Sequence, residues 1–211
     1  DLISKSSGEN AHGSIINTFS LDKLDSFMRP TEGTYVSLIT ELSSKFGTTD
    51  DHIKNIALYK NYKNYKKNIL SVQTKIGNIY SINNKNLLSN DKFSLGGRWL
   101  RGFDTFGAGP RESATSYIGG NNLIVAKFDL SRPINSKSDS PIDLNLFTDI
   151  GKVWDNKSKP LNSKESIRSS YGFGIKFYTP VGPVGFSWAF PISSETYDNK
   201  RMFIFTIGNL N

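Results

Sequence analysis

The sequence predicts an all-β fold whose antiparallel strands cross a membrane as part of a β-barrel. Apolar and polar residues alternate over stretches of about ten residues, and Gly, Pro, Asn and Asp gather between these stretches. Only 36% of the 211 residues are apolar, yet 12% are aromatic. Disordered chains are poor in aromatic residues, and no segment shows the 3.6-residue period of a helix.

The clearest alternation runs over 142–149, where Ile142, Leu144 and Leu146 share one face of the predicted strand. Five further stretches alternate in the same way: 70–77, 124–131, 167–177, 184–190 and 203–208. Weaker strands fit four more stretches: 14–25, 34–43, 52–62 and 92–99. We therefore expect about ten strands, each with an apolar and a polar face.

Alternation alone also fits a soluble sandwich or a lipocalin-like barrel with an apolar interior. Two features favour the membrane barrel. The strands approach the roughly 9–11 residues that cross a bilayer at a tilt, and the polar faces carry the Gly, Ser, Asn, Lys and Asp that suit a wet lumen. Eight apolar residues are then expected to point outward to lipid: Ile142, Leu144, Leu146, Phe173, Phe177, Phe186, Trp188 and Phe205.

Composition excludes several kinds of site. The chain has no Cys and only two His residues, so cysteine sites and most histidine-based metal or catalytic sites lack their residues. Neither His12 nor His52 lies near a nucleophile motif, and His52 is expected to be a solvated residue at a strand edge. The net charge of +7 comes from scattered Lys residues, so nucleic-acid binding is not expected. The sequence contains no run of about 18 apolar residues, so no transmembrane helix is predicted.

A long Gly-rich connection, residues 92–120, stands out between two predicted strands. It reads KFSLGGRWLRGFDTFGAGPRESATSYIGG and contains the tripeptide Arg101-Gly102-Phe103. Long loops in compact folds are usually functional or disordered. A solvated loop would not need Leu100, Phe103 and Phe106, so this one is expected to pack against another surface.

Several motifs in a fixed order make the chain similar to the outer-membrane assembly factors of the BamA type, members of the outer-membrane insertase superfamily. These are an LD…PTEG turn (24–33), a GG…RGF loop with GPR and GGN (96–121), LFTDIGKVWD (146–155), IRSSYGFGIKFYTPVGPVGFSWAFP (167–191) and FIFTIG (203–208). The GAGPRE continuation of the loop most resembles alphaproteobacterial members.

The resemblance implies a sixteen-stranded barrel preceded by periplasmic POTRA domains, with the Gly-rich loop folded into the lumen. Residues 1–211 would be the C-terminal portion of this barrel, about its last ten strands, because sixteen strands at about 20 residues each need more than 300 residues. A complete ten-stranded barrel is the alternative. Family members usually end in an aromatic residue, whereas this chain ends Asn209-Leu210-Asn211.

The resemblance also assigns site residues. Arg101 of the RGF motif (Arg101, Gly102 and Phe103) would meet acidic residues on the inner wall, and the matching positions are Asp129 and Asp149. The alternation independently places both acids on polar faces. The alternative is a solvated loop arginine with two unrelated acids. Gly208 would kink the closing strand at a seam that opens sideways, unless it is an ordinary strand-end glycine.

The function implied is that of a non-enzymatic insertase in the bacterial outer membrane, with no cofactor, metal or catalytic residue. Its partners would be unfolded outer-membrane β-barrel clients, lipoproteins of an assembly complex and outer-membrane lipid. A client strand would add to the seam by β-augmentation. The alternatives are a translocation or secretion pore of the same superfamily and a passive diffusion porin.

Overall fold

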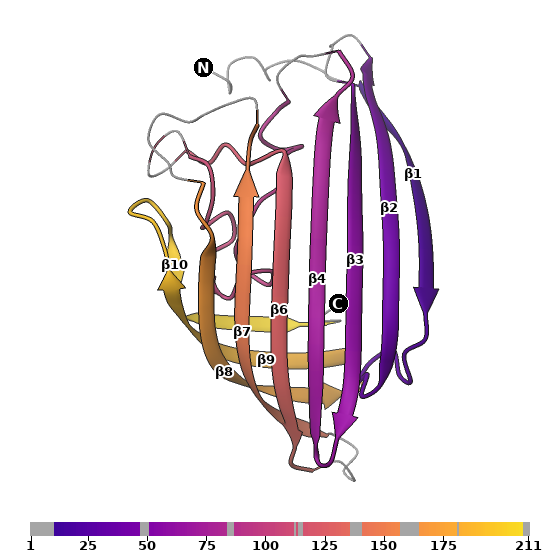
Figure 1. Ribbon diagram of the computed structural model, residues 1–211, viewed down its shortest axis with the longest axis vertical. Coiled ribbons are helices and arrows are strands. Elements are labelled where there is room, and N and C mark those ends of the chain that lie inside the picture. The colour runs from indigo at the N-terminus through magenta and orange to yellow at the C-terminus, as the bar shows by residue number, and fades with distance from the viewer. Residues whose placement is uncertain are drawn as a thin grey trace.

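The computed structural model describes residues 11–46, 51–83, 87–111, 113, 116–135, 141–156, 165–180 and 182–208. Within these residues nine strands form one antiparallel sheet, in the order β1-β2-β3-β4-β6-β7-β8-β9-β11 (Figure 1). The bounds are β1 Ala11–Asp22, β2 Gly33–Phe46, β3 His52–Tyr65, β4 Asn68–Ser81, β6 Asn122–Pro133, β7 Ile142–Trp154, β8 Arg168–Thr179, β9 Gly182–Ser193 and β11 Phe203–Ile207. Two short strands, β5 (Gly102–Phe103) and β10 (Lys200–Arg201), pair with each other.

The sheet is curved but open. Its edges are β1, which pairs with β2, and β11, which pairs with β9, and the two edges do not pair with each other in the described part of the chain. Figure 1 shows the sheet curling so that β9 and β11 pass behind the strands at the centre of the view. This arrangement agrees with part of a larger barrel and not with a closed ten-stranded one.

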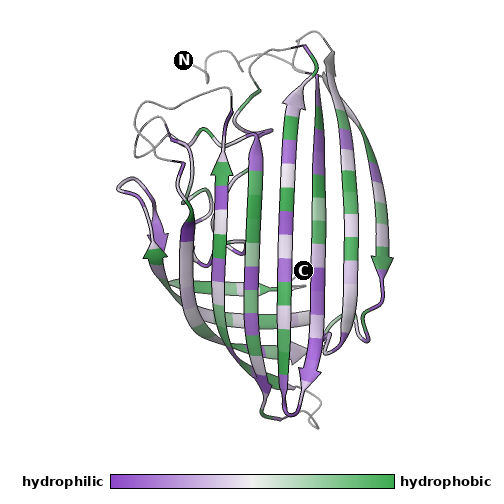
Figure 2. Ribbon diagram, viewed as in Figure 1, coloured by the Kyte–Doolittle hydropathy of each residue, from purple (hydrophilic) through white to green (hydrophobic). Residues whose placement is uncertain are grey.

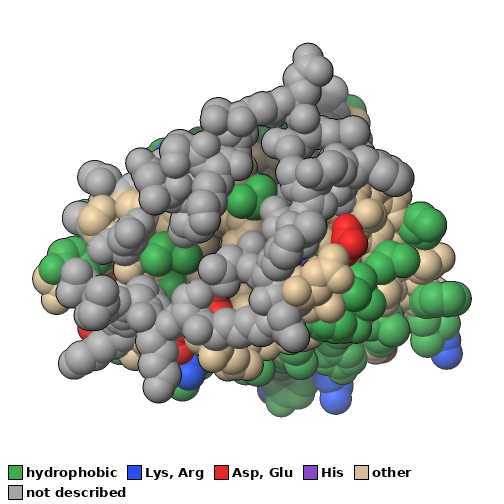
Figure 3. Space-filling view, turned by 90° about the horizontal axis from the view of Figure 1, so that it is seen from above, with side chains coloured by type: hydrophobic (Ala, Val, Ile, Leu, Met, Phe, Trp, Pro, Cys, Tyr) green, Lys and Arg blue, Asp and Glu red, His purple; other side chains and the backbone are tan. Residues whose placement is uncertain are grey.

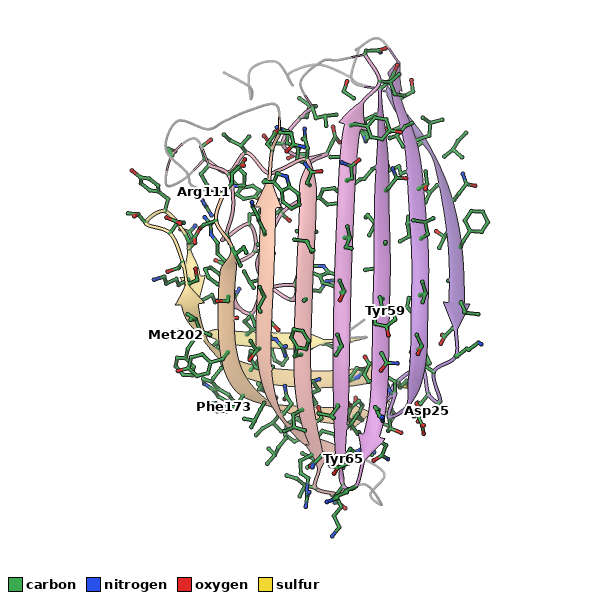
Figure 4. All side chains as sticks on the ribbon, in the orientation of Figure 1. Asp25, Tyr59, Tyr65, Arg111, Phe173 and Met202 are labelled. Carbon is green, nitrogen blue, oxygen red and sulfur yellow. The ribbon has the colours of Figure 1, made fainter. Side chains whose placement is uncertain are left out.

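The outer face of the sheet is apolar. Of the eight residues expected to face lipid, Leu144, Leu146, Phe173, Trp188 and Phe205 are exposed, and the other three are half-buried on the same face. Apolar bands cross neighbouring strands in Figure 2, and Phe173 projects from the outside in Figure 4. Seen from the end with the longer connections, hydrophobic side chains gather on the outer rim (Figure 3). The soluble-barrel alternative is therefore wrong.

Aromatic side chains pack along this outer face. The ring of Phe173 stacks on that of Trp188 at a centroid distance of 5.6 Å, and Phe186 lies 5.1 Å from Phe205. These residues are directly opposite each other in adjacent strands. Cross-strand aromatic pairs of this kind stabilise a sheet.

The inner face of the sheet carries a hydrophobic core. Residues of the connection between β4 and β6 fold back against β4, β6 and β7 and form a buried apolar cluster there. Its members are Ile79, Leu87, Phe93, Leu95, Leu100, Phe103, Ala108, Leu123, Val125 and Val153. Leu100 and Phe103 are thus covered by the barrel wall as expected. The expectation is wrong for Phe106, which is 52% exposed because its ring contacts Tyr117 rather than the inner cluster.

Three local expectations are wrong. Residues 92–99 do not form a sheet strand; Phe93 bridges to Gly120 and Leu95 to Ala108, because Gly96 and Gly97 take positive φ and turn the chain inward. The first strand ends at Asp22 rather than at residue 25. His52 is not solvated but 2% exposed, because it is the first inward-facing residue of β3.

No helix in the described ranges is long and apolar enough to cross a membrane.

A charge on the outer face should be costly. Leu146 is 60% exposed between Leu130 and Phe173, its partners on the two neighbouring strands. We expect Leu146→Arg to destabilise the barrel in liposomes by about 2–4 kcal/mol, as measured by urea unfolding followed on gels by heat-modifiable migration. Ile167→Arg is the matched control, because Ile167 is 57% exposed but precedes β8 at the end of the barrel. Equal effects of the two substitutions would argue against a lipid-facing Leu146.

Candidate functional site

The loop enters the lumen through a tight backbone turn. The amide of Gly97 donates to the carbonyl of Phe103 at 3.0 Å, and the amide of Ala108 donates to the carbonyl of Leu95 at 3.1 Å. Gly96 has a φ of +129°, and a Cβ there would lie 1.9 Å from the carbonyl oxygen of Asp104. A side chain at this position would therefore not fit.

Arg101 contacts both predicted carboxylates. Its Nε and Nη2 donate to Asp149 at 2.8 and 2.6 Å, and its Nη1 and Nη2 donate to Asp129 at 2.9 and 3.1 Å. Its backbone amide also donates to Asp149 Oδ2 at 2.9 Å. The structure thus brings together Arg101, Asp129 and Asp149, hereafter the Arg101 cluster.

The Arg101 cluster is buried, so each of its charges is stabilised by the opposite charges beside it rather than by water. The side chains of Arg101, Asp129 and Asp149 are 8%, 4% and 0% exposed. Burial by itself would lower the pKa of the Arg101 guanidinium, but Asp129 and Asp149 together raise this pKa above its ordinary value. Arg101 therefore stays charged, and the two-pronged geometry is one that arginine makes and lysine does not.

Neighbouring side chains on the same wall hold the cluster in place. The Arg101 guanidinium carbon lies 3.5 Å from the ring centroid of Phe147, which follows the same inward-facing alternation as Asp149. Asn145 donates to Asp129 Oδ1 at 3.3 Å, and Lys176 Nζ lies 3.9 Å from the same oxygen. Neither Asn145 nor Phe147 is predicted as a site residue from the sequence, although both lie on the polar face of the strand that carries Asp149.

Gly102 and Phe103 fix the direction of the loop beyond Arg101. Gly102 has a φ of +95°, and a Cβ would lie 3.2 Å from that of Ser170 on β8. Phe103 is fully buried in the inner apolar cluster. A cavity of about 300 Å³ lies between the Arg101 cluster and the inner side of β11 at residues 204–207.

Gly208 lies directly after the end of β11 and has a φ of +89°. Its amide donates to the carbonyl of Pro183 at 2.9 Å, and a Cβ would meet no atom within 4 Å. The backbone therefore bends at this glycine, and the strain of a substitution would come from φ rather than from crowding. Whether this bend serves a seam stays a prediction.

The model of the Omp85 superfamily domain matches residues 3–210, nearly the whole chain. The chain belongs to the Omp85 superfamily. A SAM50-like protein of Schizosaccharomyces pombe is 29% identical over 92% of this chain and 43% of its own length. The outer membrane protein assembly factor BamA of Nitratidesulfovibrio vulgaris is 25% identical over 98% of this chain and 26% of its own.

The fold supports the same assignment. A crystal structure of BamA from Haemophilus ducreyi lacking POTRA domains 1–3 superposes with a TM-score of 0.77 at 21% identity, over 93% of this chain and 42% of that one. Together with the family match and the BamA relatives, this fold makes the Omp85 chain part of an outer-membrane β-barrel of the BamA type, which agrees with the predicted location in the bacterial outer membrane. It spans less than half the length of these relatives.

Among the described residues of the Omp85 chain, no group of three or more His, Cys, Asp or Glu could hold a metal ion. Several charged side chains inside the barrel form ion pairs between segments that are distant in sequence.

One such pair, which the sequence did not predict, joins the β1–β2 turn to the opposite wall. Arg29 Nη2 lies 2.6 Å from Asp143 Oδ1 on β7, and its guanidinium carbon lies 5.2 Å from the ring centroid of Tyr178 on β8. Asp143 is 1% exposed and Arg29 is 18% exposed. The turn therefore reaches across the concave side of the sheet and ties β1 and β2 to β7 and β8.

Removing this ion pair should destabilise the curved sheet. We expect Arg29→Ala to leave the Asp143 carboxylate without its cation and to destabilise the Omp85 barrel by roughly 1–3 kcal/mol, as measured by urea unfolding in liposomes. Lys23→Ala is the control, because Lys23 is an exposed cation of the same turn. Equal midpoints for the two variants would contradict a structural role for Arg29.

Proposed function

We propose that the protein containing this chain is an outer-membrane β-barrel assembly factor that folds and inserts client β-barrels at a lateral seam. The observation that carries the proposal is the match to the Omp85 superfamily over residues 3–210. The relatives include an outer membrane protein assembly factor and a 50 kDa subunit of a sorting assembly machinery. These names describe the relatives, and their function is extended to this chain as part of the proposal.

The short edge strand β11 supports the choice of this edge for the seam. It has five residues, against twelve in β9, and its partner in the described sheet is β9 alone. An edge strand of this kind presents unpaired backbone donors and acceptors to one side. In the proposal, a client strand pairs with these groups and each added strand then templates the next.

The Arg101 cluster would hold the base of the loop on the inner wall, away from β11. It anchors the loop to β6 and β7, two strands in the interior of the sheet, while the cavity separates it from β11. In the proposal, β11 pairs with a client strand at its free edge while the Arg101 cluster stays in place.

The proposed work involves no covalent chemistry and no cofactor. The free energy comes from the client, whose backbone groups find partners as its barrel closes in lipid. The proposed partners are unfolded β-barrel clients, lipoproteins of an assembly complex and the surrounding lipid, which the apolar outer face would contact.

The test uses the complete protein in liposomes with an unfolded client barrel. We expect faster folding of the client, read from heat-modifiable migration, and a cross-link from Phe205→Cys to a cysteine in a terminal client strand. Tyr59→Cys is the matched control, because Tyr59 is 43% exposed on the outer face, against 47% for Phe205, but lies in β3, which is paired on both sides. We expect no cross-link from Tyr59→Cys.

The alternatives give different results. A secretion pore would release its substrate across the membrane without inserting it. A diffusion porin would admit small solutes and leave the rate of client folding unchanged. Equal cross-linking from the two cysteines would contradict a seam at β11.

A further inference from the structure

The chain leaves the main sheet just before its last strand. The amide of Ala189 on β9 donates to the carbonyl of Met202 at 2.8 Å, and β11 pairs with β9 from Phe203 onward. Before Met202, the segment 194–201, here the terminal hairpin, turns away from the main sheet, while the final residues of β9 pair with β8. Met202 marks this departure in Figure 4.

The terminal hairpin pairs instead with the Gly-rich connection between β4 and β6, here the lumen loop. Lys200 and Arg201 lie opposite Phe103 and Gly102 in an antiparallel ladder. The amide of Asp104 donates to the carbonyl of Asn199 at 2.9 Å, and the amide of Asn199 donates to the carbonyl of Gly107 at 2.8 Å. The segment that leads into β11 is therefore bonded to the residues that follow Arg101.

A buried ion pair holds the terminal hairpin from its other side. Arg168, the first residue of β8, donates from Nε and Nη2 to the two carboxylate oxygens of Asp198, at 3.0 and 3.2 Å. The two side chains are 1% and 2% exposed. Asp198 Oδ2 also accepts the amide of Glu195 at 2.7 Å, so the same carboxylate closes the turn of the hairpin.

Among the described residues, one further side-chain contact reaches the tip of the hairpin: Ser166 Oγ, before β8, donates to Glu195 Oε1 at 2.5 Å. Thr196 is exposed, Tyr197 is 40% exposed, and the ion pair between Arg201 and Asp104 is 57% and 49% exposed and so contributes little. A buried, two-pronged pair is a much stronger restraint, because losing one partner leaves the other as an uncompensated charge.

We infer that Arg168 and Asp198 are positioning residues for the seam strand. They hold the terminal hairpin against the lumen loop, and this sets the point at which the chain enters β11. The inference rests on the proposed function, because it assigns these residues a role in presenting β11 to a client. In this inference the lumen loop is not only anchored on β6 and β7. It also positions the start of the seam strand β11 through its contact with the terminal hairpin.

The contact between hairpin and loop can be measured without any activity. Residues 104 and 199 continue the antiparallel register of the short ladder, so the pair Asp104→Cys and Asn199→Cys is placed to form a disulfide. This chain has no cysteine of its own to compete. In the complete protein, we expect Asp198→Asn, which keeps the size of the side chain, to slow disulfide formation at least threefold.

Activity then shows whether the contact positions the seam. We expect Asp198→Asn to lower the rate of client insertion roughly threefold to tenfold while the protein still folds, as judged by heat-modifiable migration. Oxidising the 104–199 cysteine pair should restore at least half of the lost rate, and a reducing agent should remove the rescue. A variant that is merely misfolded would not respond in this reversible way.

A second disulfide controls for general stabilisation. Thr40 and Asn55 lie directly opposite each other on β2 and β3, where Thr40 Oγ1 donates to Asn55 Oδ1 at 2.9 Å, far along the sheet from β11. The pair Thr40→Cys and Asn55→Cys should form its disulfide equally with and without Asp198→Asn, and it should not restore insertion. Rescue by both disulfides would overturn the inference.

The two proposals fail in different ways. Unchanged disulfide formation at 104–199 in Asp198→Asn, in a protein that does insert clients, would overturn the positioning role alone. The other outcome is that disulfide formation at 104–199 depends on Asp198 but the wild-type protein inserts no client. That outcome would overturn the proposed function and its use of the hairpin.

Discussion

Replacing Arg101 by alanine is expected to destabilise the barrel by about 3–5 kcal/mol and to reduce client insertion by an order of magnitude or more. The substitution leaves Asp129 and Asp149 buried without their shared cation, and an uncompensated buried charge is costly. It also removes the bonds that tie the loop to β6 and β7. Urea unfolding in liposomes measures the first effect, and the client-folding assay measures the second.

Two variants show whether the effect belongs to the geometry of the cluster. Arg101→Lys keeps the charge but loses the planar fork, so it should recover only part of the stability and activity. Arg132→Ala removes an arginine whose contact, with Asn68 on the neighbouring strand, is exposed, so it should change the unfolding free energy by less than about 0.5 kcal/mol. Full activity of Arg101→Ala would contradict a functional role for the cluster.

The strands and their facing could be predicted because they depend on a local signal. A strand that separates lipid from a polar lumen must alternate, so Leu144 and Leu146 could be assigned outward and Asp149 inward from the sequence alone. The same alternation put Asp129 and Asp149 on the inner wall. The pairing with Arg101 needed the family resemblance, because no local pattern tells which wall a long loop will meet.

The contacts that were missed join segments that are far apart in the sequence. Arg29 and Asp143 are separated by 114 residues, and Arg168 and Asp198 by 30. Each of these residues taken alone looks like a solvated charge at the end of a strand. The first pairing follows from the curvature of the sheet and the second from the inward turn of the terminal hairpin. A period of two residues specifies neither.

The inward turn at residues 92–99 was missed for a related reason. An apolar residue at every second position predicts a strand, and Phe93 and Leu95 fit that pattern. Their partners are instead Gly120 and Ala108 in the same loop, and the positive φ of Gly96 and Gly97 ends the extended run. Two adjacent glycines were the local signal that favoured a turn at this point.

Phe103→Ala should be the most damaging apolar substitution in the loop. Phe103 is fully buried in the inner apolar cluster and sits on β5, which pairs with β10. Removing its ring leaves a cavity that the rigid barrel wall cannot fill by collapsing, so we expect a loss of about 3–5 kcal/mol in the free energy of unfolding. The loop should also become accessible to protease between Gly97 and Gly107 while the sheet stays paired.

Phe106→Ala provides the matched control within the same loop. Phe106 is 52% exposed, and its ring makes one edge-on contact with Tyr117 at a centroid distance of 5.5 Å. Truncating it should lower the unfolding free energy by less than about 1.5 kcal/mol and leave the loop protected from protease. Equal losses for the two variants would mean that the loop is held by its polar contacts alone. A large loss for Phe103→Ala only would show that the apolar anchor and the Arg101 cluster act together, because the ring follows the arginine by two residues and fills the space that the inward turn creates.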